Sequence, residues 1–474
     1  MGRRSSPREF LPRRENERMR RLMIGVSGVR GVVGETFTPE LLTRLGEAFG
    51  TYTHGGKIVV GRDTRTSGEM VKHAVLSGLL SAGCEIVDLG ISATPSAAMM
   101  IPLLRARGGV VISASHNAVE WNALKFFRAD GVYLNDPQGR ELLDIYYGGD
   151  FRQVNWDGVR TVAENADAVE HHVERILKLV DARALRRRKF TVALDCCNGA
   201  GVEVATQFLS RVGCRILPLF CKPDGLFPRT PEPTREHVTA LTRLVRRRGA
   251  DVGFALDPDA DRVACVSEAG RYVGEEYTLA LSVRYVLGHK RGAVVTNVST
   301  SRMIDDVAAE FGCAVVRVPV GEVNVADRML ETKAVIGGEG NGGVIYPPVH
   351  YSRDSIAGMA LILQYLLESG RTLSALVREI PAYTMVKTKV ECDRASARSI
   401  LPALEERVRC DAVDRQDGVK FLWKDAWVHL RGSNTEPVLR IISEARSPRR
   451  ARALAREYSA LAAQGMKRWN RKNS

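Results

Sequence analysis

One strand–helix–strand unit occurs three times along this chain. In each copy a short apolar strand leads into a polar turn and a helix, and a Gly-Cys pair then precedes a second strand. A glycine after a helix suits the left-handed backbone that often terminates one. Continuous apolar strands between helices predict sheets covered on both faces, and hence three similar mixed-sheet α/β domains. The paired strands are Lys57–Val60 with Glu85–Leu89, Phe190–Leu194 with Arg215–Leu219, and Ala293–Val295 with Ala314–Val318.

The C-terminal part of the chain has a different pattern. A strand at 385–390, a helix from about Ala395, a strand-rich stretch at 418–430 and 437–442, and a final helix at 450–463 predict an α+β domain. Because 474 residues are too many for one ordinary core, several domains are expected. The predicted division is a basic, disordered tail at 1–21, domain I at 22–160, domain II at 161–263, domain III at 264–383 and domain IV at 384–474.

The net charge of +14 is concentrated at the two ends of the chain. Residues 1–21 carry +5 and residues 445–474 carry +8, which leaves about +1 for everything between them. A basic tail could touch RNA or an anionic surface, but a solvated end is the simpler interpretation, so nucleic-acid binding is not expected.

Hydropathy and cysteine spacing bear on location. In the sequence no apolar run approaches the roughly eighteen residues that a membrane span needs, so no membrane association is expected. Nine cysteines without CxxC or zinc spacing favour reduced thiols and a cytoplasmic location.

Hydroxyl and basic residues follow an apolar strand near residue 112. Val110–Ile112 runs into Ser113-Ala114-Ser115-His116-Asn117, and Lys125 follows eight residues later. The carboxyl ends of strands are where α/β sheets bind ligands, and a serine there could act as a nucleophile if a neighbouring group removes its proton. A lone histidine is more often a packed or capping residue, so a purely structural interpretation of this loop stays open.

Three carboxylates stand at alternate positions in Asp257-Pro258-Asp259-Ala260-Asp261-Arg262, directly after an apolar strand. They repel one another unless a positive group lies among them, and a hard divalent cation with oxygen ligands relieves that repulsion. A calcium-binding loop would need a glycine turn, whereas here the chain continues as a strand at 263–266. We therefore prefer a metal site over solvated acids, with Mg²⁺ favoured if phosphate is a ligand.

Two further loops carry weaker patterns. Five glycines lie among residues 337–343, leaving Glu339 and Asn341 as the polar side chains that could bind hydroxyl groups; a simple glycine-rich turn is an equal alternative. The second loop is rich in donors that match phosphate oxygens, although it could also be a surface turn. Its candidate residues are Arg431, Ser433, Asn434, Thr435 and, slightly beyond, Arg440.

Taken together and in this order, the four loops resemble those of the α-D-phosphohexomutase family, over residues 22–474. The matching segments are Gly28–Gly34, Ala114–Asn117, the aspartates of 257–261 followed by Arg262, Gly338–Gly342 and Arg431–Thr435. Three departures stand out. Ala118 replaces a common proline, Pro258 and Ala260 replace common glycines, and Asn341 and Gly343 stand where many members have Ser and His.

The resemblance implies a fold with four domains around a central cleft and a Mg²⁺-dependent isomerase, an intramolecular phosphotransferase. It implies a phosphoserine at Ser115, a bisphosphorylated sugar intermediate and a sugar bisphosphate activator. The implied metal ligands are Ser115, Asp257, Asp259 and Asp261. Other implied roles are proton transfer or charge stabilisation by Arg30, His116 and Lys125, and substrate binding by Arg262, Glu339, Asn341, Arg431, Ser433, Asn434, Thr435 and Arg440.

The substrate is less constrained than the reaction. The form Ser113-Ala114-Ser115 resembles that of phosphoglucosamine mutases, so interconversion of glucosamine 1- and 6-phosphate is the leading expectation. Phosphomannomutase or phosphoglucomutase activity is the nearest alternative. A regulator that binds sugar phosphates without turnover belongs to a different class, and the combination of nucleophile and metal loop argues against it. The sequence leaves the oligomeric state and the general base open.

Overall fold

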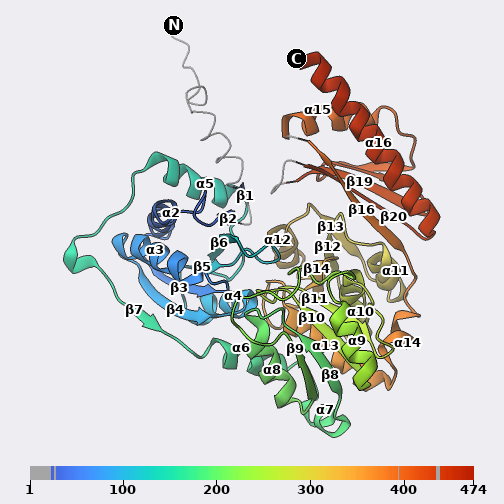
Figure 1. Cartoon of the computed structure of the whole chain (residues 1–474), viewed down its shortest axis with the longest axis horizontal. Coiled ribbons are helices and arrows are strands. Elements are labelled where there is room, and N and C mark those ends of the chain that lie inside the picture. The colour runs from blue at the N-terminus through green and yellow to red at the C-terminus, as the bar shows by residue number, and fades with distance from the viewer. Residues whose placement is uncertain (1–22, 26–27, 393, 434–437, 474) are drawn as a thin grey trace.

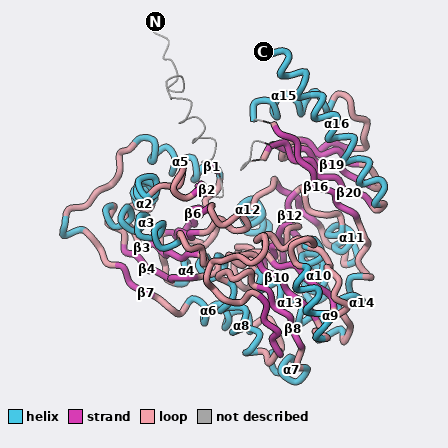
Figure 2. Tube along the Cα trace, in the orientation of Figure 1, coloured by secondary structure: helices cyan, strands magenta, loops and turns pink. Residues whose placement is uncertain are grey.

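The computed structural model describes residues 23–25, 28–392, 394–433 and 438–473. Three α/β domains and a C-terminal domain with an antiparallel sheet surround a central cleft, which confirms the predicted fold class (Figure 1). Helices lie against both faces of the first three sheets, while the helices of the last domain lie on one side of its sheet (Figure 2). The predicted tail at 1–21 lies outside the described residues.

Domain I is built on a seven-stranded sheet in the order β1-β2-β6-β5-β3-β4-β7. Strands β3, β4, β5 and β7 are parallel, whereas β6, β2 and β1 pair antiparallel. The elements are β1 (Met23–Gly25), β2 (Gly28–Val32), α2 (Pro39–Tyr52), β3 (Lys57–Arg62), α3 (Gly68–Ser81), β4 (Glu85–Ile91), α4 (Thr94–Leu103), β5 (Gly108–Ile112), β6 (Trp121–Arg128), α5 (Asp136–Gly148), the 3-10 helix η1 (Trp156–Gly158) and β7 (Val162–Glu164).

Domain II has a four-stranded sheet in the order β11-β10-β8-β9, and domain III one in the order β13-β12-β14-β15. The elements of domain II are α6 (Ala168–Leu177), α7 (Ala182–Arg188), β8 (Thr191–Asp195), α8 (Gly201–Arg211), β9 (Arg215–Leu219), α9 (Thr239–Arg248), β10 (Val252–Leu256) and β11 (Val263–Ser267). Those of domain III are α10 (Glu275–His289), β12 (Val294–Asn297), α11 (Met303–Glu310), β13 (Val315–Val318), α12 (Glu322–Thr332), β14 (Ile336–Glu339), β15 (Gly343–Ile345), α13 (Ser355–Ser369) and α14 (Leu373–Val377).

The three predicted strand–helix–strand units are present as parallel strand pairs, β3 with β4, β8 with β9 and β12 with β13. Their boundaries differ from the prediction by at most two residues: β8 begins at Thr191, β12 runs through Asn297, and β9 matches its predicted range. The glycines that follow the three helices, Gly83, Gly213 and Gly312, have φ of 80°, 73° and 65°, as a left-handed helix terminus requires.

The repeat extends further than the sequence pattern predicted. In each domain the first strand of the unit pairs on its other side with a third parallel strand, which then pairs with an antiparallel fourth. These fourth strands are β6, β11 and β15. The connections between the third and fourth strands are therefore equivalent in the three domains. They are the loops at 113–120, 257–262 and 340–342.

Domains II and III share one continuous apolar core, to which α6, α8, α10 and α13 contribute buried residues. Domain I packs apolar residues on both faces of its sheet, and domain IV has a core of its own. The domain boundaries remain predictions; the one proposed after residue 263 would divide β11, which pairs with β10 over its whole length.

Domain IV has an antiparallel sheet in the order β16-β20-β19-β18-β17. The final helix is longer than the predicted range 450–463, because good helix formers continue beyond it. The strand-rich stretch predicted at 418–430 consists of two strands with a turn between them. The elements are β16 (Thr384–Glu391), α15 (Arg394–Glu405), β17 (Ala412–Asp414), β18 (Val419–Leu422), β19 (Ala426–Gly432), β20 (Val438–Ala445) and α16 (Pro448–Asn473).

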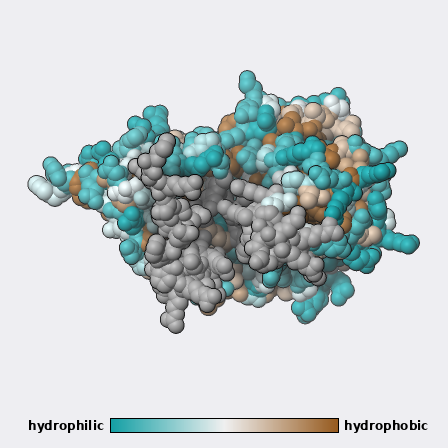
Figure 3. Space-filling model, turned by 90° about the horizontal axis from the view of Figure 1, so that it is seen from above, coloured by the Kyte–Doolittle hydropathy of each residue, from teal (hydrophilic) through white to brown (hydrophobic). Residues whose placement is uncertain are grey.

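Polar contacts attach domain IV to domain III. Lys420 Nζ donates to the Val298 carbonyl over 2.6 Å, and the Arg302 backbone N–H donates to Glu444 over 3.0 Å. Among the coloured residues seen from above in Figure 3, hydrophilic ones predominate, and a patch of hydrophobic residues lies between them. Of the helices in the described part of the chain, none combines the length and apolar composition that a bilayer crossing requires.

Candidate active site

A cleft of about 1720 Å³ lies among the four domains. All four domains line it. They do so through domain I, the aspartate loop of domain II at 257–262 (called the metal loop below), the glycine-rich loop of domain III at 337–343 and the sheet of domain IV. The cleft brings together ten of the residues predicted from sequence: Arg30, Ser115, His116, Lys125, Arg262, Glu339, Asn341, Arg431, Ser433 and Arg440. The predicted residues Asn434 and Thr435 lie outside the described residues.

Ser115 occupies a strained turn between β5 and β6. Its φ is 49°, a left-handed value that non-glycine residues rarely adopt, and it is 2% exposed. The buried guanidinium of Arg65 holds the turn by donating to four backbone carbonyls, those of Ser115, Asn117, Ala118 and Trp121, over 2.7–2.9 Å. Asp63 in turn pairs with Arg65 and accepts from Ser113 Oγ. This clamp fixes the serine before any ligand binds.

The Ser115 hydroxyl faces the metal loop of domain II. Its Oγ donates to Asp257 Oδ2 over 2.8 Å and lies 3.4 Å from His116 Nδ1. Burial, and then the neighbouring cations Arg262 and Arg30, lower the pKa of His116 well below its ordinary value. Arg30 itself donates to Asn117 Oδ1 over 2.9 Å. The predicted nucleophile, histidine and arginine thus lie together at one wall of the cleft.

The three aspartates fit a divalent cation. Asp257, Asp259 and Asp261 are each 0% exposed, and one oxygen of each lies within 4.8 Å of the others. Protein donors hold one oxygen of Asp259 and one of Asp261, whereas Oδ1 of both is buried without a hydrogen-bond partner among the described residues. Asp261 Oδ1 also lies 3.5 Å from Arg262 Nε. Buried carboxylate oxygens that lie close together and lack hydrogen-bond donors are what a hard cation requires.

Protein donors orient Asp259 through its Oδ2 atom. Lys125 Nζ and Thr94 Oγ1 each lie 2.5 Å from Asp259 Oδ2. Burial acts to raise the pKa of Asp259, but the Lys125 ammonium and these hydrogen bonds hold it below its ordinary value. Burial, with Asp261 and Asp259 nearby, raises the pKa of Asp257 well above its ordinary value. The trio is therefore a site of concentrated negative potential.

The backbone of the metal loop is shaped by the neighbouring turn of domain II. Ala260 has a φ of 57° and is fully buried, so a larger side chain would find no room. The turn at 198–201 packs on it, because a Cβ at Gly199 would lie 2.4 Å from the Pro258 carbonyl oxygen. The small residues of both segments let the two loops touch.

Arg353 joins the metal loop to the glycine-rich loop. Its guanidinium donates to Asp261 over 2.5 Å, to Glu339 over 2.7 Å and to Glu322 over 2.9 Å. Its side chain fills the space beside Gly343, where a Cβ would lie 2.2 Å from Arg353 Cδ. Glycine at position 343 therefore makes room for this arginine.

Glu339 is more constrained than the sequence indicated. Asn297 Nδ2 donates to its Oε1 over 2.7 Å and the Gly321 N–H over 3.2 Å, while Oε2 accepts from Arg353. Asn341 uses its own Oδ1 to accept the Gly343 N–H. The carboxylate predicted to bind sugar hydroxyls is thus largely paired with protein donors.

The domain IV wall presents cations to the same cleft. Arg431, which is 7% exposed, donates through Nε to Asp417 Oδ2 over 2.8 Å. Asp417 Oδ2 also accepts the Val320 N–H of domain III over 3.1 Å. Arg440 lies opposite Arg431 in the sheet and opposite Lys389 of β16, and Lys387 and Lys389 line the cleft beside them. This wall can bind an anion.

Sequence reasoning missed Arg65, Arg353 and Asp417. Arg65 lies in the polar turn that follows β3, but no local pattern in the sequence shows that it holds a loop fifty residues away. Arg353 directly precedes Asp354, which caps α13, and that cap could have been recognised. Nothing near Asp417 in the sequence indicates its role.

Models of known families match the chain in four consecutive segments. All four describe phosphoglucomutase/phosphomannomutase: alpha/beta/alpha domain I at residues 21–153, alpha/beta/alpha domain II at 170–270, alpha/beta/alpha domain III at 275–383 and the C-terminal domain at 385–461.

Two curated relatives are similar over nearly their whole length. A "probable phosphoglucosamine mutase" of Methanopyrus kandleri is 42% identical over 92% of this chain and 96% of its own. A "phosphoglucomutase/phosphomannomutase" of Thermococcus kodakarensis is 38% identical over 91% of this chain and 96% of its own. Among solved structures, a phosphoglucomutase/phosphomannomutase family protein of Burkholderia thailandensis superposes with a TM-score of 0.81 at 24% identity, covering 94% of this chain and 98% of its own, which shows a shared fold.

Proposed function

The chain belongs to the phosphoglucomutase/phosphomannomutase family and is therefore an isomerase of the phosphohexomutase class, and within that class we propose that it interconverts the 1- and 6-phosphates of glucosamine. One observation supports the mechanism above all others. Ser115 Oγ lies 2.8 Å from the aspartate trio, and the cationic wall of domain IV lines the same cleft. A phosphoryl donor and a separate anion site can therefore act on one bound sugar.

We propose that Ser115 carries a phosphoryl group in the resting enzyme. Asp257, Asp259, Asp261 and the Ser115 phosphoryl group would hold Mg²⁺, which supplies neutralisation of the charge that develops during phosphoryl transfer. Lys125 and Arg353 keep two of the aspartates oriented. Arg30, His116 and Lys125 are proposed to transfer protons or stabilise charge beside Ser115, and the Arg65 clamp keeps the serine in place.

The domain IV wall is proposed to bind the phosphate that the substrate already carries. Arg431, Ser433, Asn434, Thr435 and Arg440 would supply donors there, and Arg262, Glu339 and Asn341 would contact the rest of the substrate. The free sugar hydroxyl attacks the phosphorus of phosphoserine, its proton leaves to a base, and Ser115 Oγ departs. The bisphosphorylated sugar then turns end for end, and its other phosphate returns to Ser115. A sugar bisphosphate would accordingly activate unphosphorylated enzyme.

The nucleophile can be tested directly. Replacing Ser115 with Ala should abolish conversion of glucosamine 1-phosphate to the 6-phosphate, because the phosphoryl group has nowhere to reside. Intact-mass measurement should find one phosphate on the wild-type protein and none on the variant. Undiminished turnover by the variant would end the proposal.

The metal loop gives a second test. Asp259→Asn should lose Mg²⁺-dependent activity while circular dichroism stays that of the wild type, since the side-chain volume is kept and a ligand charge is removed. Activity that survives a chelator would show that the carboxylates do not hold a required metal.

The choice of sugar needs a competition assay of glucosamine, glucose and mannose phosphates with a bisphosphate activator present. Phosphomannomutase or phosphoglucomutase activity is the alternative within the family, supported by the name of the Thermococcus kodakarensis relative. A regulator without turnover would bind these compounds, carry no phosphate on Ser115 and convert none of them. A cytoplasmic location remains a prediction from the unpaired cysteines.

A further inference from the structure

A second carboxylate lines the sugar side of the cleft, and no pattern in the sequence marked it. Glu276, the second residue of α10, lines the cleft together with Asn297, Thr300 and Gly340. Among the described residues, the hydrogen bond to its carboxylate comes from the Ser301 N–H, over 3.0 Å to Oε2. Since a carboxylate can accept about four hydrogen bonds, most of its capacity is unused.

Glu276 and Glu339 differ in how many of their hydrogen-bond acceptor positions are already occupied by the protein. Glu339 is engaged by Asn297, Gly321 and Arg353, so its oxygens have little left for a ligand. Glu276 is half-buried, faces the cleft and keeps most of its acceptor positions. A substrate group with hydrogen-bond donors would therefore meet Glu276 as the available carboxylate on this side.

Gly340 makes the position of Glu276 possible. A Cβ at residue 340 would lie 2.0 Å from Glu276 Oε2 and 2.3 Å from its Cδ. The carboxylate thus lies flat against the backbone of the glycine-rich loop, in the space that any other side chain at 340 would take. The glycine is needed for the placement of a charged group and not only for a turn.

The surroundings of Glu276 favour a cationic partner. Burial raises the pKa of its carboxyl to about 8, although Lys387 nearby acts to lower it. Lys387 is itself paired with Glu275 over 3.0 Å. A half-buried carboxyl group with a raised pKa gains most from a ligand that brings both positive charge and N–H donors. A sugar hydroxyl brings one donor and no charge, whereas the ammonium of an amino sugar brings three donors and a full charge.

We propose that Glu276 determines specificity by binding the ammonium group of a hexosamine phosphate. This inference rests on the proposed function and adds to it the residue that selects an amino sugar over a neutral hexose. Glu276 contacts substrate in this assignment but takes no part in phosphoryl transfer, which occurs at Ser115.

The test compares substrates in the full-length enzyme with Mg²⁺ and a bisphosphate activator. Glu276→Gln keeps the shape and removes the charge. It should lower kcat/KM for glucosamine 6-phosphate about ten-fold or more, and change that for glucose and mannose 6-phosphate by less than about three-fold. Glu310→Gln removes a carboxylate from the surface of the same domain and should change none of the three values.

A second variant keeps the Glu276 carboxylate but changes its position. Gly340→Ala should displace the Glu276 carboxylate and shift the preference in the same direction, whereas Glu276→Asp should fall between the wild type and Glu276→Gln. Equal losses for all three sugars, or an unchanged preference in both Glu276→Gln and Gly340→Ala, would overturn the inference. If the wild type converts none of the sugars, the proposed function itself fails, and that result is distinct from a wild type that works without using Glu276.

Discussion

Two buried arginines, Arg65 and Arg353, are the residues on which the geometry of the cleft depends. Arg65 is 1% exposed and gives its donors to backbone carbonyls of the serine loop. Arg353 is 8% exposed and gives its donors to carboxylates of three different segments. A planar guanidinium offers several donors in fixed directions, so each arginine holds together loops that lie far apart in the sequence.

Arg353→Met should disable the enzyme and destabilise it. The change leaves Asp261, Glu322 and Glu339 without their shared cation, and an uncompensated buried charge costs about 3–5 kcal/mol. Because Arg353 orients Asp261, kcat/KM should fall about 10- to 100-fold and half-activation should need more Mg²⁺. Activity against Mg²⁺ concentration and chemical denaturation provide the two measurements.

Two further substitutions calibrate this result. Arg353→Lys keeps the positive charge but loses the planar set of guanidinium donors, so it should retain intermediate activity. Arg328→Met removes an exposed arginine of the same domain and should change stability by no more than about 0.5 kcal/mol. If Arg353→Met matched the wild type in stability and Mg²⁺ dependence, the bridging role would be excluded.

A site residue could be predicted from the sequence when the residues that reveal its role lie close to it along the chain. Ser115 and the aspartate trio could be predicted because each lies in a short segment where a strand ends in polar residues of one kind. Arg353 and Glu276 could not, since each lies in an ordinary charged pair, Arg353-Asp354 and Glu275-Glu276, of a kind common at helix starts. Their meaning comes from the contacts with Gly343 and Gly340, which only the folded chain makes.

At the scale of elements, the three equivalent loops explain how one fold collects a nucleophile, a metal site and a sugar loop. Each loop follows the third strand of a repeated four-strand unit and enters the same cleft. The sequence repeat predicted the first two strands and the helix of each unit. It did not predict that the third and fourth strands repeat as well, because the segments between them differ in length and composition.

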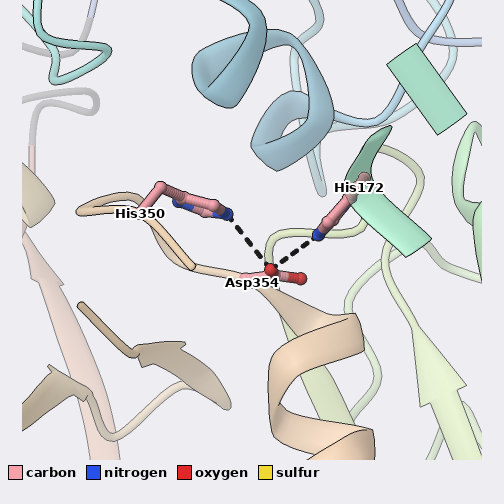
Figure 4. Close-up of side chains that lie close together, drawn as sticks. All are labelled: His172, His350 and Asp354. Carbon is pink, nitrogen blue, oxygen red and sulfur yellow. Dashed lines mark hydrogen bonds and ion pairs between the residues drawn. The ribbon is translucent and has the colours of Figure 1, made fainter. Parts of the chain in front are cut away.

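The N-terminus of α13 is a joint between domains. Asp354 caps the helix by accepting the Ile356 and Ala357 N–H groups through Oδ1. Its Oδ2 accepts from Nε2 of His172 over 2.8 Å and of His350 over 3.1 Å (Figure 4). His172 Nδ1 lies 2.8 Å from Ser96 Oγ, so α4, α6 and α13 meet in one hydrogen-bonded cluster.

The hydrogen bonds of His350 indicate a neutral imidazole. The Ser352 N–H donates to His350 Nδ1 over 2.9 Å, so His350 Nε2 carries the proton that faces Asp354. The nitrogens that a metal ion would need are thus already engaged with protein groups. Burial acts to raise the pKa of Asp354, but the two histidines hold it below its ordinary value.

Asp354→Ala should lower the free energy of unfolding by about 3–5 kcal/mol, since it removes a helix cap and the shared acceptor of two buried imidazoles. Thr372→Ala removes the cap of α14 without affecting a buried histidine, so it should lower the free energy of unfolding by about 1 kcal/mol. Denaturation followed by near-ultraviolet circular dichroism measures both. A difference between the two variants of less than about 1 kcal/mol would contradict the interdomain role.

In the whole molecule, the position of domain IV decides whether the two walls of the cleft can act on one sugar. Arg431 is held by Asp417, which also accepts the Val320 N–H of domain III. His429 is 0% exposed at the same interface, where its Nε2 donates to the Asp417 carbonyl over 2.5 Å and its Nδ1 accepts from Ser299 Oγ over 2.9 Å. This arrangement suits a neutral imidazole, and burial favours that form by lowering the pKa of His429.

Acidification should therefore loosen domain IV. Burial lowers the pKa of His429 to about 4, and the cations Lys420 and Arg431 act in the same direction against Asp417. A histidine whose folded pKa is depressed contributes stability that is complete above its unfolded pKa of about 6.5 and is lost as the pH falls toward 4, to a total of about 3 kcal/mol. The KM for the sugar phosphate should rise as the pH approaches 4, where His429 becomes protonated in the folded enzyme, because the charged imidazole weakens the contact that places Arg431.

The comparison that isolates this effect is between the wild type and His429→Gln. Glutamine can donate to the Asp417 carbonyl and accept from Ser299 but does not titrate, so its stability at pH 5 should fall less than that of the wild type. Trp427, buried beside His429 on β19 with its Nε1 donating to Glu444 over 2.7 Å, reports the interface through its fluorescence. Parallel pH dependences in the two proteins would mean that other groups govern the attachment of domain IV. A steeper dependence in the wild type would assign the pH-dependent attachment of domain IV to this single imidazole.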